Sequence, residues 1–332
     1  MDKWTTRKVE KLFKKRLYSN ILQKEEAKEL IPPAKREQRG KVSARFWTTD
    51  QLPGLGSRYG FIKAPSTCQI ACVYTAKGGV LKTTLAFNIA RTAALNGVKT
   101  LVVGLDVQCS ITDLLSKNLD QYESIEDVQS PPGLYSVVKG DYKIHEVIQV
   151  CDLPTLHYLP ENPNISLLEH EFSSRDNKID SISKLISPLK DKYNFIIFDC
   201  SPSWSVVIKN ALLASNHIIS PLGCDVGSYR SVSQNIQRIS QFKNENDLSW
   251  DSFSVIPTLR ENSKISAQIE AQYRTEYGDL CSNNSIRRTV LGQENSLKFK
   301  TVFEDAPSSS LSDNYFDLIK ELWGKVEGAT NG

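Results

Sequence analysis

Short apolar runs alternate with longer amphipathic stretches from Ser66 to the end of the chain. The short runs predict buried strands, and the longer stretches predict helices that cover them. The predicted strands are residues 69–74, 100–105, 155–159, 195–199, 217–221 and 252–257. This alternation is typical of crossover units on a parallel sheet. We therefore expect an α/β fold, with a mostly parallel, twisted sheet flanked by helices.

Three helices are predicted from apolar residues at helical spacing. The first covers residues 83–96, and Gly97 directly after it is a natural C-terminal cap. The second, at 179–192, leads into a predicted strand, whereas residues 120–132 indicate a surface loop. The third, at 313–326, gathers its apolar residues on one side. We expect it to dock on the sheet, and a membrane-binding tail is the alternative.

The N-terminal segment differs in charge from the rest of the chain. The 332 residues carry a net charge of +3. Residues 1–65 hold 16 Lys and Arg against 7 Asp and Glu, giving +9, which leaves −6 for residues 66–332. We predict two parts, a basic N-terminal arm at 1–65 and a main domain at 66–332. Such an arm favours a polyanionic partner, and a solvated lysine-rich helix is the alternative.

Hydropathy and cysteine spacing argue against several classes of protein. No apolar run approaches the roughly 18 to 20 residues that cross a bilayer, and the N-terminus lacks the apolar core of a secretory signal. We therefore expect a cytoplasmic protein. The seven cysteines include no C-x-x-C pair, and the four histidines lie apart from them. This spacing predicts neither a zinc site nor a disulfide framework, and buried free thiols are expected instead.

A loop rich in glycine and lysine follows the first predicted strand and precedes the first predicted helix. It reads Ala76-Lys77-Gly78-Gly79-Val80-Leu81-Lys82-Thr83-Thr84. Backbone N–H groups of such a loop can surround phosphates, while Lys82 supplies a cation and the Thr83 hydroxyl can hold Mg²⁺. The usual pattern G-x-x-x-x-G-K-[ST] fails, because Ala76 and Leu81 occupy its glycine positions. A lysine-rich surface turn is the alternative.

Two carboxylates end predicted strands at suitable places for a phosphate site. Asp106 follows the strand at 100–105, and Asp199 closes the strand at 195–199. A carboxylate at the carboxyl edge of a strand beside the loop can orient the water that attacks the γ-phosphorus. We assign this role to Asp106. Asp199 can anchor Mg²⁺ through water.

These segments together resemble the ParA/MinD group of P-loop ATPases, and within it the ParA partition ATPases, over nearly the whole chain from Ser66. The group's deviant Walker A motif, K-G-G-x-x-K-T-[TS], matches Lys77-Gly78-Gly79-Val80-Leu81-Lys82-Thr83-Thr84. Its D-x-D-P-Q element is similar to residues 104–108, and its Walker B element, with Asn-Ala-Leu downstream, is similar to 199–203 and 210–212. Its P-T-x phrase resembles Pro257-Thr258-Leu259.

The resemblance implies ATP and Mg²⁺ as ligands and gives each motif residue a role. Lys77 would reach across a homodimer to the partner's phosphates, and Lys82 and Thr83 would bind phosphate and Mg²⁺ within their own subunit. Asp106 would position the attacking water, and Asp199 would be the Walker B carboxylate. Pro257 and Thr258 would complete the nucleotide site. Two lysines from two subunits would then neutralise each γ-phosphate, so that intact ATP holds the dimer together.

Three departures from the family's pattern bear on hydrolysis. Leu81 stands where a glycine is commonest. Gly104 and Val107 replace the first acid and the proline of D-x-D-P-Q, and Cys200-Ser201 replaces the usual threonine-proline. We therefore expect weak hydrolysis of ATP, and a binder that is nearly inactive in hydrolysis is the alternative.

In this family the ATP-bound dimer binds DNA without sequence preference, which requires cationic side chains along one face. The candidates here are Arg238, Lys264, Arg287, Arg288, Lys298 and Lys300. Each alone is more often an ordinary solvated charge, and only the adjacent Arg287-Arg288 pair stands out in its family context. Residues 22–59 resemble the winged helix-turn-helix segment that precedes the ATPase in larger plasmid ParA proteins. This implies a small, mainly helical extension that binds an operator and represses its own gene, and a dimerisation or partner-docking arm is the alternative.

The leading hypothesis is a ParA-type partition ATPase. It would form an ATP-dependent homodimer, bind DNA nonspecifically on the nucleoid, and hydrolyse ATP when stimulated by a ParB-like centromere-binding partner, with no role for a membrane. A MinD-like positioning switch that acts on membrane or on a protein scaffold is the alternative. A third hypothesis is a regulatory DNA-binding protein whose ATP site only sets its oligomeric state.

Overall fold

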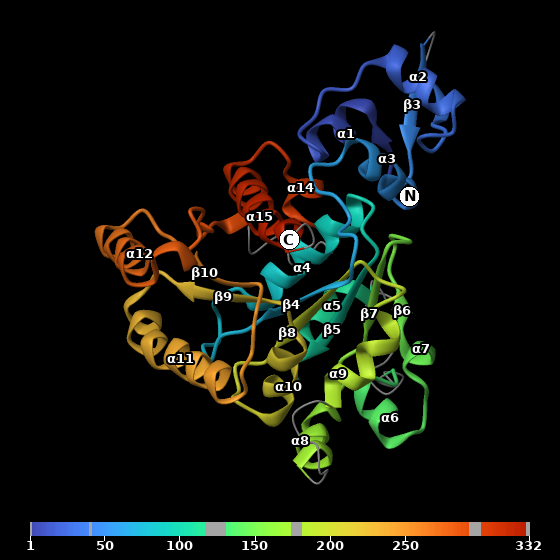
Figure 1. Ribbon diagram of the computed structural model, residues 1–332. Helices are drawn as coiled ribbons and strands as arrows, with labels where there is room; N and C mark the ends of the chain where they lie inside the picture. Colours follow the sequence, from blue (N-terminus) through green and yellow to red (C-terminus); the bar gives the residue numbers. More distant parts are fainter. Residues whose placement is uncertain (1, 40–41, 117–130, 174–180, 292–299, 330–332) are drawn as a thin grey trace, which may run out of the picture.

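The computed structural model describes residues 2–39, 42–116, 131–173, 181–291 and 300–329, and its body is a seven-stranded sheet (Figure 1). The strand order is β10-β9-β4-β8-β5-β7-β6. The strands are β4 (Gln69–Val73), β5 (Thr100–Leu105), β6 (Gln149–Val150), β7 (Leu156–Leu159), β8 (Phe195–Cys200), β9 (His217–Gly223) and β10 (Ser252–Thr258). All pair in parallel except β6 with β7. The predicted mostly parallel α/β sheet is confirmed.

Helices cover both faces of the sheet. One face carries α4 (Lys82–Leu95), α5 (Ser110–Ser116), α14 (Val302–Asp305) and α15 (Ser310–Gly328). The other carries α6 (Leu134–Lys139), α7 (Ile144–Val147), α8 (Ile165–Ser173), α9 (Ser181–Ile186), α10 (Val206–Ala214) and α11 (Val226–Glu245). Successive side chains of a strand point to opposite faces of the sheet, so they pack alternately into the hydrophobic cores on the two faces. Ala71 packs into the core on the α4 face and Cys72 into the core on the other face.

The predicted helices are found with one correction. Residues 83–96 correspond to α4, after which Gly97 adopts a φ of +85°. Residues 313–326 lie within α15. The helix expected at 179–192 is shorter, because α9 ends at Ile186 and the 3-10 turn η4 (Ser187–Leu189) follows. Pro188 in that turn cannot donate a helical hydrogen bond. The loop expected at 120–132 falls almost wholly outside the described residues.

A further helix packs beside the β10 edge of the sheet. This helix, α12 (Lys264–Tyr277), leads into the 3-10 turn η5 (Gly278–Leu280) and packs on a small separate core with Leu222 and Val255. None of the helices within the described residues is long and apolar enough to cross a bilayer.

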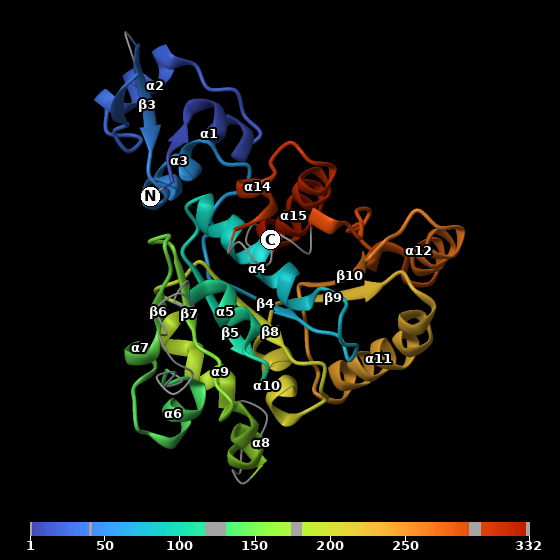
Figure 2. The ribbon, with the colours of Figure 1, turned by 180° about the vertical axis from the view of Figure 1, so that it is seen from behind.

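Residues 2–59 form an N-terminal unit that lies beside α14 and α15, at the end of the molecule away from α8 (Figures 1 and 2). Its elements are β1 (Trp4–Thr5), α1 (Thr6–Leu12), α2 (Ser19–Ala27), β2 (Lys35–Arg39), β3 (Val42–Trp47), η1 (Thr49–Gln51) and α3 (Leu52–Tyr59). The three strands pair antiparallel in the order β1-β3-β2. This sheet is additional to the mainly helical extension that the sequence predicts, since the charged segment of β2 gives no apolar alternation.

The N-terminal unit shares a continuous hydrophobic core with the body. Its α3 approaches the end of α4 so closely that a Cβ on Gly56 would lie 1.8 Å from the Leu95 carbonyl oxygen. The ring of Phe61 packs against Phe303 and Phe316, with centroids 5.9 and 4.6 Å apart. These contacts hold the far end of α4, the helix whose first turn begins at the phosphate loop.

Arg91 adds a buried ionic anchor to the same helix. Its side chain is 3% exposed, and it donates to Asp152 at 2.6 Å and to Glu304 at 2.7 Å. The neighbouring carboxylates outweigh burial and raise the pKa of Arg91 above its usual value. Because both acids come from other elements, Arg91 fixes α4 against α14 and against the turn before β7.

Candidate nucleotide-binding site

Three adjacent strands bring the predicted phosphate loop and both predicted carboxylates to one edge of the sheet. In the register, Asp199 of β8 lies between Val73 of β4 and Gly104 of β5. The loop after β4, Asp199 itself and Asp106 after β5 therefore meet at the carboxyl ends of these strands, where open α/β sheets bind ligands. A cavity of about 850 Å³ opens there. It is lined by Gly78, Gly79, Leu81, Lys82, Thr83, Thr84, Leu105, Asp106, Val107, Gln108, Ser110, Ser201, Pro202, Ser203, Ser205 and Val207, and by Ile165, Ser166 and Glu169 of α8.

The loop before α4 takes up two left-handed backbone conformations. Gly79 has a φ of +73° and Leu81 a φ of +69°. A leucine at such an angle is strained, which explains why a glycine is commonest at this position in the resembling family. Partial burial of Leu81 against the core offsets this strain. From β10, Thr258 donates to the Val80 carbonyl at 3.1 Å, so Pro257-Thr258 supports the loop without lining the cavity.

The two lysines of the loop lie in different surroundings. Lys82 is 7% exposed, and its Nζ donates to the Lys77 carbonyl oxygen at 2.7 Å. Burial lowers the pKa of Lys82, and the charges of Asp199 and Asp106 oppose this. Lys77 is exposed. Burial acts to raise the pKa of Asp225, but hydrogen bonds from Ser228 and the nearby charge of Lys77 bring it below its usual value. Lys82 thus faces inward, and Lys77 is accessible from outside.

Asp199 is a buried carboxylate that suits a hydrated cation. It is 1% exposed, and neither oxygen makes a well-formed hydrogen bond. Burial raises its pKa to about 7, although the Thr83 hydroxyl and Lys82 act to lower it. No cluster of three or more His, Cys, Asp or Glu side chains within the described ranges could hold a metal by itself. One carboxylate and one hydroxyl, completed by water and phosphate oxygens, fit Mg²⁺.

The Asp106 loop is held by a residue that the sequence analysis did not identify. Asp106 is half-buried and accepts from the Gln108 N–H at 3.0 Å. Its own N–H donates to Glu161 at 3.0 Å, and Glu161 is 2% exposed. Burial first, and then the charge of Asp199, raise the pKa of Glu161 to about 8. Glu169 of α8, which lines the cavity, was also missed. Neither glutamate belongs to a motif.

Residues 68–250, more than half of the chain, match the family described as AAA domain. Similar curated proteins are the chromosome partitioning protein ParA of Myxococcus xanthus and the sporulation initiation inhibitor protein Soj of Bacillus subtilis. The first is 30% identical over 166 residues, 50% of this chain and 56% of that protein. The second is 25% identical over 256 residues, 76% of this chain and 98% of that protein.

The chain belongs to this AAA-domain family. Solved structures share its fold. A plasmid partition protein of Borrelia burgdorferi bound to AMPPNP is 20% identical, with a TM-score of 0.64, over 78% of this chain and 100% of that chain. Cobyrinic acid a,c-diamide synthase of Mycobacterium smegmatis with bound ADP and magnesium is 22% identical, with a TM-score of 0.63, over 79% and 96% of the two chains.

The surface cations predicted to contact DNA are spread over several elements. Four of them are exposed: Arg238, Lys264, Arg287 and Arg288. Arg288 forms an ion pair with Glu261 at 2.9 Å, and Lys300 forms one with Asp2 of the N-terminal unit at 2.8 Å. Lys298 lies outside the described residues. Whether any of these side chains contacts DNA stays a prediction.

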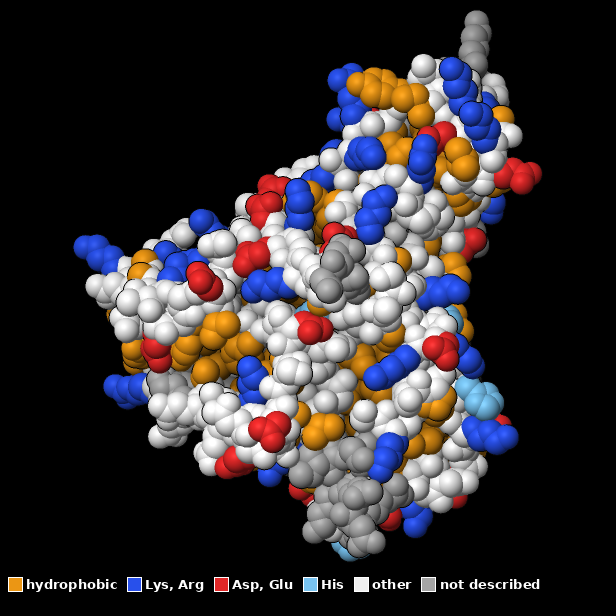
Figure 3. Space-filling view, viewed as in Figure 1, with side chains coloured by type: hydrophobic (Ala, Val, Ile, Leu, Met, Phe, Trp, Pro, Cys, Tyr) orange, Lys and Arg blue, Asp and Glu red, His pale blue; other side chains and the backbone are white. Residues whose placement is uncertain are grey.

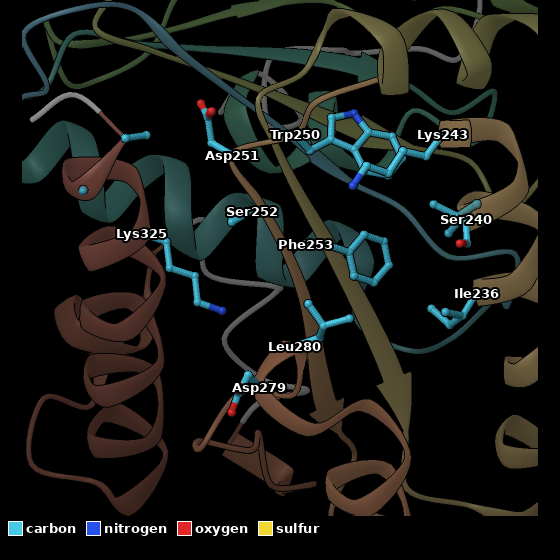
Figure 4. Close-up of a pocket in the computed structure, with 13 residues that line it drawn as sticks. Ile236, Ser240, Lys243, Trp250, Asp251, Ser252, Phe253, Asp279, Leu280 and Lys325 are labelled. Atoms are coloured by element: carbon cyan, nitrogen blue, oxygen red, sulfur yellow. The ribbon is translucent and has the colours of Figure 1, made fainter. Parts of the chain in front are cut away.

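A second cavity, of about 720 Å³, lies beside the amino end of β10 (Figure 4). Trp250 and Phe253, with ring centroids 6.2 Å apart, point into it from the start of β10. Lys325 of α15 lines the other side and donates to Ser254 at 2.9 Å. None of the predicted nucleotide-site residues lines this cavity, so it is distinct from the cavity at the phosphate loop.

The pKa of Glu161 leads to a testable pH dependence of stability. The folded, nucleotide-free chain keeps this carboxyl protonated up to about pH 8, whereas in the unfolded chain it ionises near its usual pKa of 4.5. The folded state therefore binds more protons between these values, and its stability falls as the pH rises through this window. Glu161→Gln cannot ionise, so it should not show the loss of unfolding free energy, on the order of 3 kcal/mol, that the wild type shows over this pH window. Urea unfolding of the wild type and of Glu161→Gln, at pH values from about 5.5 to about 8.5 and without Mg²⁺, measures the free energy of unfolding. Parallel pH profiles for the two proteins would contradict the prediction.

Proposed function

We propose that this protein is an ATP-dependent DNA partition ATPase. In the proposal an ATP-bound sandwich dimer binds DNA without sequence preference, and weak, partner-stimulated hydrolysis resets it to monomers. The observation that carries the proposal is the meeting of the phosphate loop, Asp106 and Asp199 at three adjacent strand ends. The ParA and Soj relatives and the partition-protein fold support the same function.

The chemistry proposed for the site is transfer of the γ-phosphoryl group of ATP to water. The backbone N–H groups of residues 78–84 would surround the phosphates at the start of α4. Lys82 would exchange its bond to the Lys77 carbonyl for one to phosphate. Asp106, which lines the cavity, would orient the attacking water. Mg²⁺, held by Thr83 and through water by Asp199, neutralises charge on the phosphate oxygens when bound.

We propose that dimerisation uses Lys77. Its exposure at the mouth of the loop leaves it accessible to a second copy, while Lys82 serves its own subunit. Each γ-phosphate would then face one cation from each subunit, and hydrolysis would remove the link. A dimer of this kind would persist while the γ-phosphate is intact and dissociate after hydrolysis, so it would act as a nucleotide-dependent switch.

The DNA-binding part of the proposal rests on surface charge. Figure 3 shows many Lys and Arg side chains over the N-terminal unit, in agreement with the +9 charge of residues 1–65. The exposed Arg238, Lys264, Arg287 and Arg288 lie on the body. We propose nonspecific contacts through the body and operator binding through the N-terminal unit, whose β2–β3 hairpin follows two helices. A ParB-like protein would be the partner that stimulates hydrolysis.

DNA binding measured with ATP, ADP or no nucleotide tests the function. We expect binding of a random-sequence duplex only with ATP and Mg²⁺, and a loss of affinity of about tenfold or more between 50 and 200 mM salt, because phosphate contacts release counterions. Fluorescence anisotropy measures this. Equal binding in all three nucleotide states would contradict the proposal. Pelleting with anionic liposomes in the presence of ATP, but no DNA binding, would instead support a MinD-like switch.

Lys77→Gln is expected to leave ATP binding nearly unchanged and to weaken the ATP-dependent dimer by about tenfold or more, because a charge-assisted contact to the partner's phosphate is lost. Light scattering with a slowly hydrolysed ATP analogue measures the monomer–dimer equilibrium. Lys99→Gln is the matched control, since Lys99 is an exposed lysine at the opposite end of the sheet. A dimer of wild-type strength in Lys77→Gln would remove Lys77 from the interface.

A further inference from the structure

The space above Gly104 is filled by a side chain from another strand end. Gly104 pairs with Asp199 in the sheet, so a side chain at position 104 would lie on the same face as that carboxylate. A Cβ built on Gly104 would lie 2.2 Å from Cγ and 2.5 Å from Oε1 of Glu161. Glu161, which follows β7, therefore occupies the volume that a side chain at position 104 would take.

The carboxyl group of Glu161 lies close to where an aspartate at position 104 would place its own, with its Cδ 2.4 Å from the hypothetical Cβ, compared with the bond length of about 1.5 Å between Cβ and the carboxyl carbon of an aspartate. The 2.5 Å between the hypothetical Cβ and Glu161 Oε1 is about the separation of Cβ and Oδ1 within one aspartate. Position 104 is also where this chain lacks the first acid of the D-x-D-P-Q element. The acid missing from β5 is thus supplied, in space, by the loop after β7.

Glu161 holds both ends of the loop that carries Asp106. Its Oε1 accepts from the Asp106 N–H at 3.0 Å, at the end of β5. Its Oε2 accepts from the N–H and the hydroxyl of Thr112 in α5, at 3.4 and 3.3 Å, and its own N–H donates to the Thr112 hydroxyl at 2.8 Å. Because Glu161 is 2% exposed and does not line the cavity, it acts on the loop and not on a ligand.

We propose that Glu161 is a positioning residue for hydrolysis, and that residue 104 is a glycine so that this carboxyl group can clamp the Asp106 loop from the neighbouring strand. The inference rests on the proposed ATPase function and deepens it. A water in line with the γ-phosphorus must be held within a fraction of an ångström. Loosening the clamp therefore lowers turnover, while ATP affinity, which depends on the phosphate loop, stays nearly the same.

The test exchanges the position of the acid in the full-length protein. Four variants are compared: Glu161→Ala, Glu161→Gln, Gly104→Asp and the double variant G104D/E161A. For each, kcat and KM for ATP are measured with Mg²⁺ and plasmid DNA, and amide hydrogen exchange is followed over residues 105–112. Glu171→Ala is the matched control, because this α8 carboxylate pairs with Lys139 on the surface, at 3.6 Å.

Glu161→Ala should lower kcat about tenfold with KM nearly unchanged, and should speed exchange of the Asp106 amide. Glu161→Gln should keep both, because the amide oxygen still accepts from Asp106. Gly104→Asp alone should lose turnover and exchange protection of the Asp106 loop, because its side chain overlaps with Glu161. The double variant should regain kcat to within about threefold of wild type, together with the exchange protection, as coupled positions do.

The proposal is overturned if the double variant is no better than Glu161→Ala, or if Glu161→Ala matches the wild type in turnover and in exchange. Should Glu161→Ala not fold, the comparison of G104D/E161A with Gly104→Asp decides: recovery supports the clamp and equal loss refutes it. A wild-type protein that releases no phosphate would refute the proposed function instead, while hydrogen exchange would still decide whether Glu161 clamps the loop.

Discussion

Lys82→Ala is expected to weaken ATP binding by at least about 100-fold, or about 3 kcal/mol. Lys82 is the buried cation of the phosphate loop, 7% exposed and close enough to Asp199 and Asp106 for their charges to act on its pKa. Without it, the triphosphate would face two carboxylates with no cation from its own subunit. Titration of a fluorescent ATP analogue in the presence of Mg²⁺ measures the change.

Two further variants separate the charge of Lys82 from its volume. Lys82→Met keeps most of the buried side chain but not the charge, so it should lose as much affinity as Lys82→Ala. Lys99→Ala, at the opposite end of the sheet, should bind normally. If Lys82→Met bound ATP within about threefold of the wild type, the loop before α4 would not be the phosphate site.

The sheet and the phosphate loop were predictable because their signals are local. Each central strand is a short apolar run buried on both faces, and the loop lies between a strand and a helix in a fixed order. The weaker elements have no such signal. The edge strand β6 has two residues, and β2 has the charged sequence KREQR, so neither shows a period that sequence reasoning could find.

The conformation of the loop was only partly predictable. Leu81 could be recognised as the residue at a usual glycine position, but its φ of +69° and its packing against the core are known only from the structure. The family's P-T-x phrase marked Thr258 as a site residue. Its hydrogen bond to Val80 instead shows how β10 supports the loop from behind.

Glu161 could not be found from the sequence, because its contacts depend on three-dimensional proximity. It lies 57 positions after Gly104 in the numbering, and the pairing of β5 with β7 brings the two strand ends together. The one signal in the sequence was a missing acid at position 104. That gap alone suggests a weakened site, whereas the structure places a buried carboxyl group in the same space.

Asp106→Ala is expected to lower ATP turnover about 100-fold while ATP binding and dimerisation persist. The half-buried Asp106 carboxylate lines the cavity, where it can orient the attacking water. Alanine removes this carboxylate but keeps the backbone N–H that Glu161 accepts at 3.0 Å, so the loop should keep its path. The variant should therefore load ATP, pair through Lys77 and remain paired, because the phosphate that links the subunits is not cleaved.

The trapped state of Asp106→Ala gives three independent readouts. Phosphate release should fall, light scattering with ATP and Mg²⁺ should show a persistent dimer, and the protein should stay on DNA after free ATP is diluted. Asp113→Ala is a matched control, because this carboxylate lies one turn into α5 and outside the cavity lining. A variant that stays monomeric with ATP would show that Asp106 supports dimer formation itself, and would contradict its assignment as the residue that only positions the water.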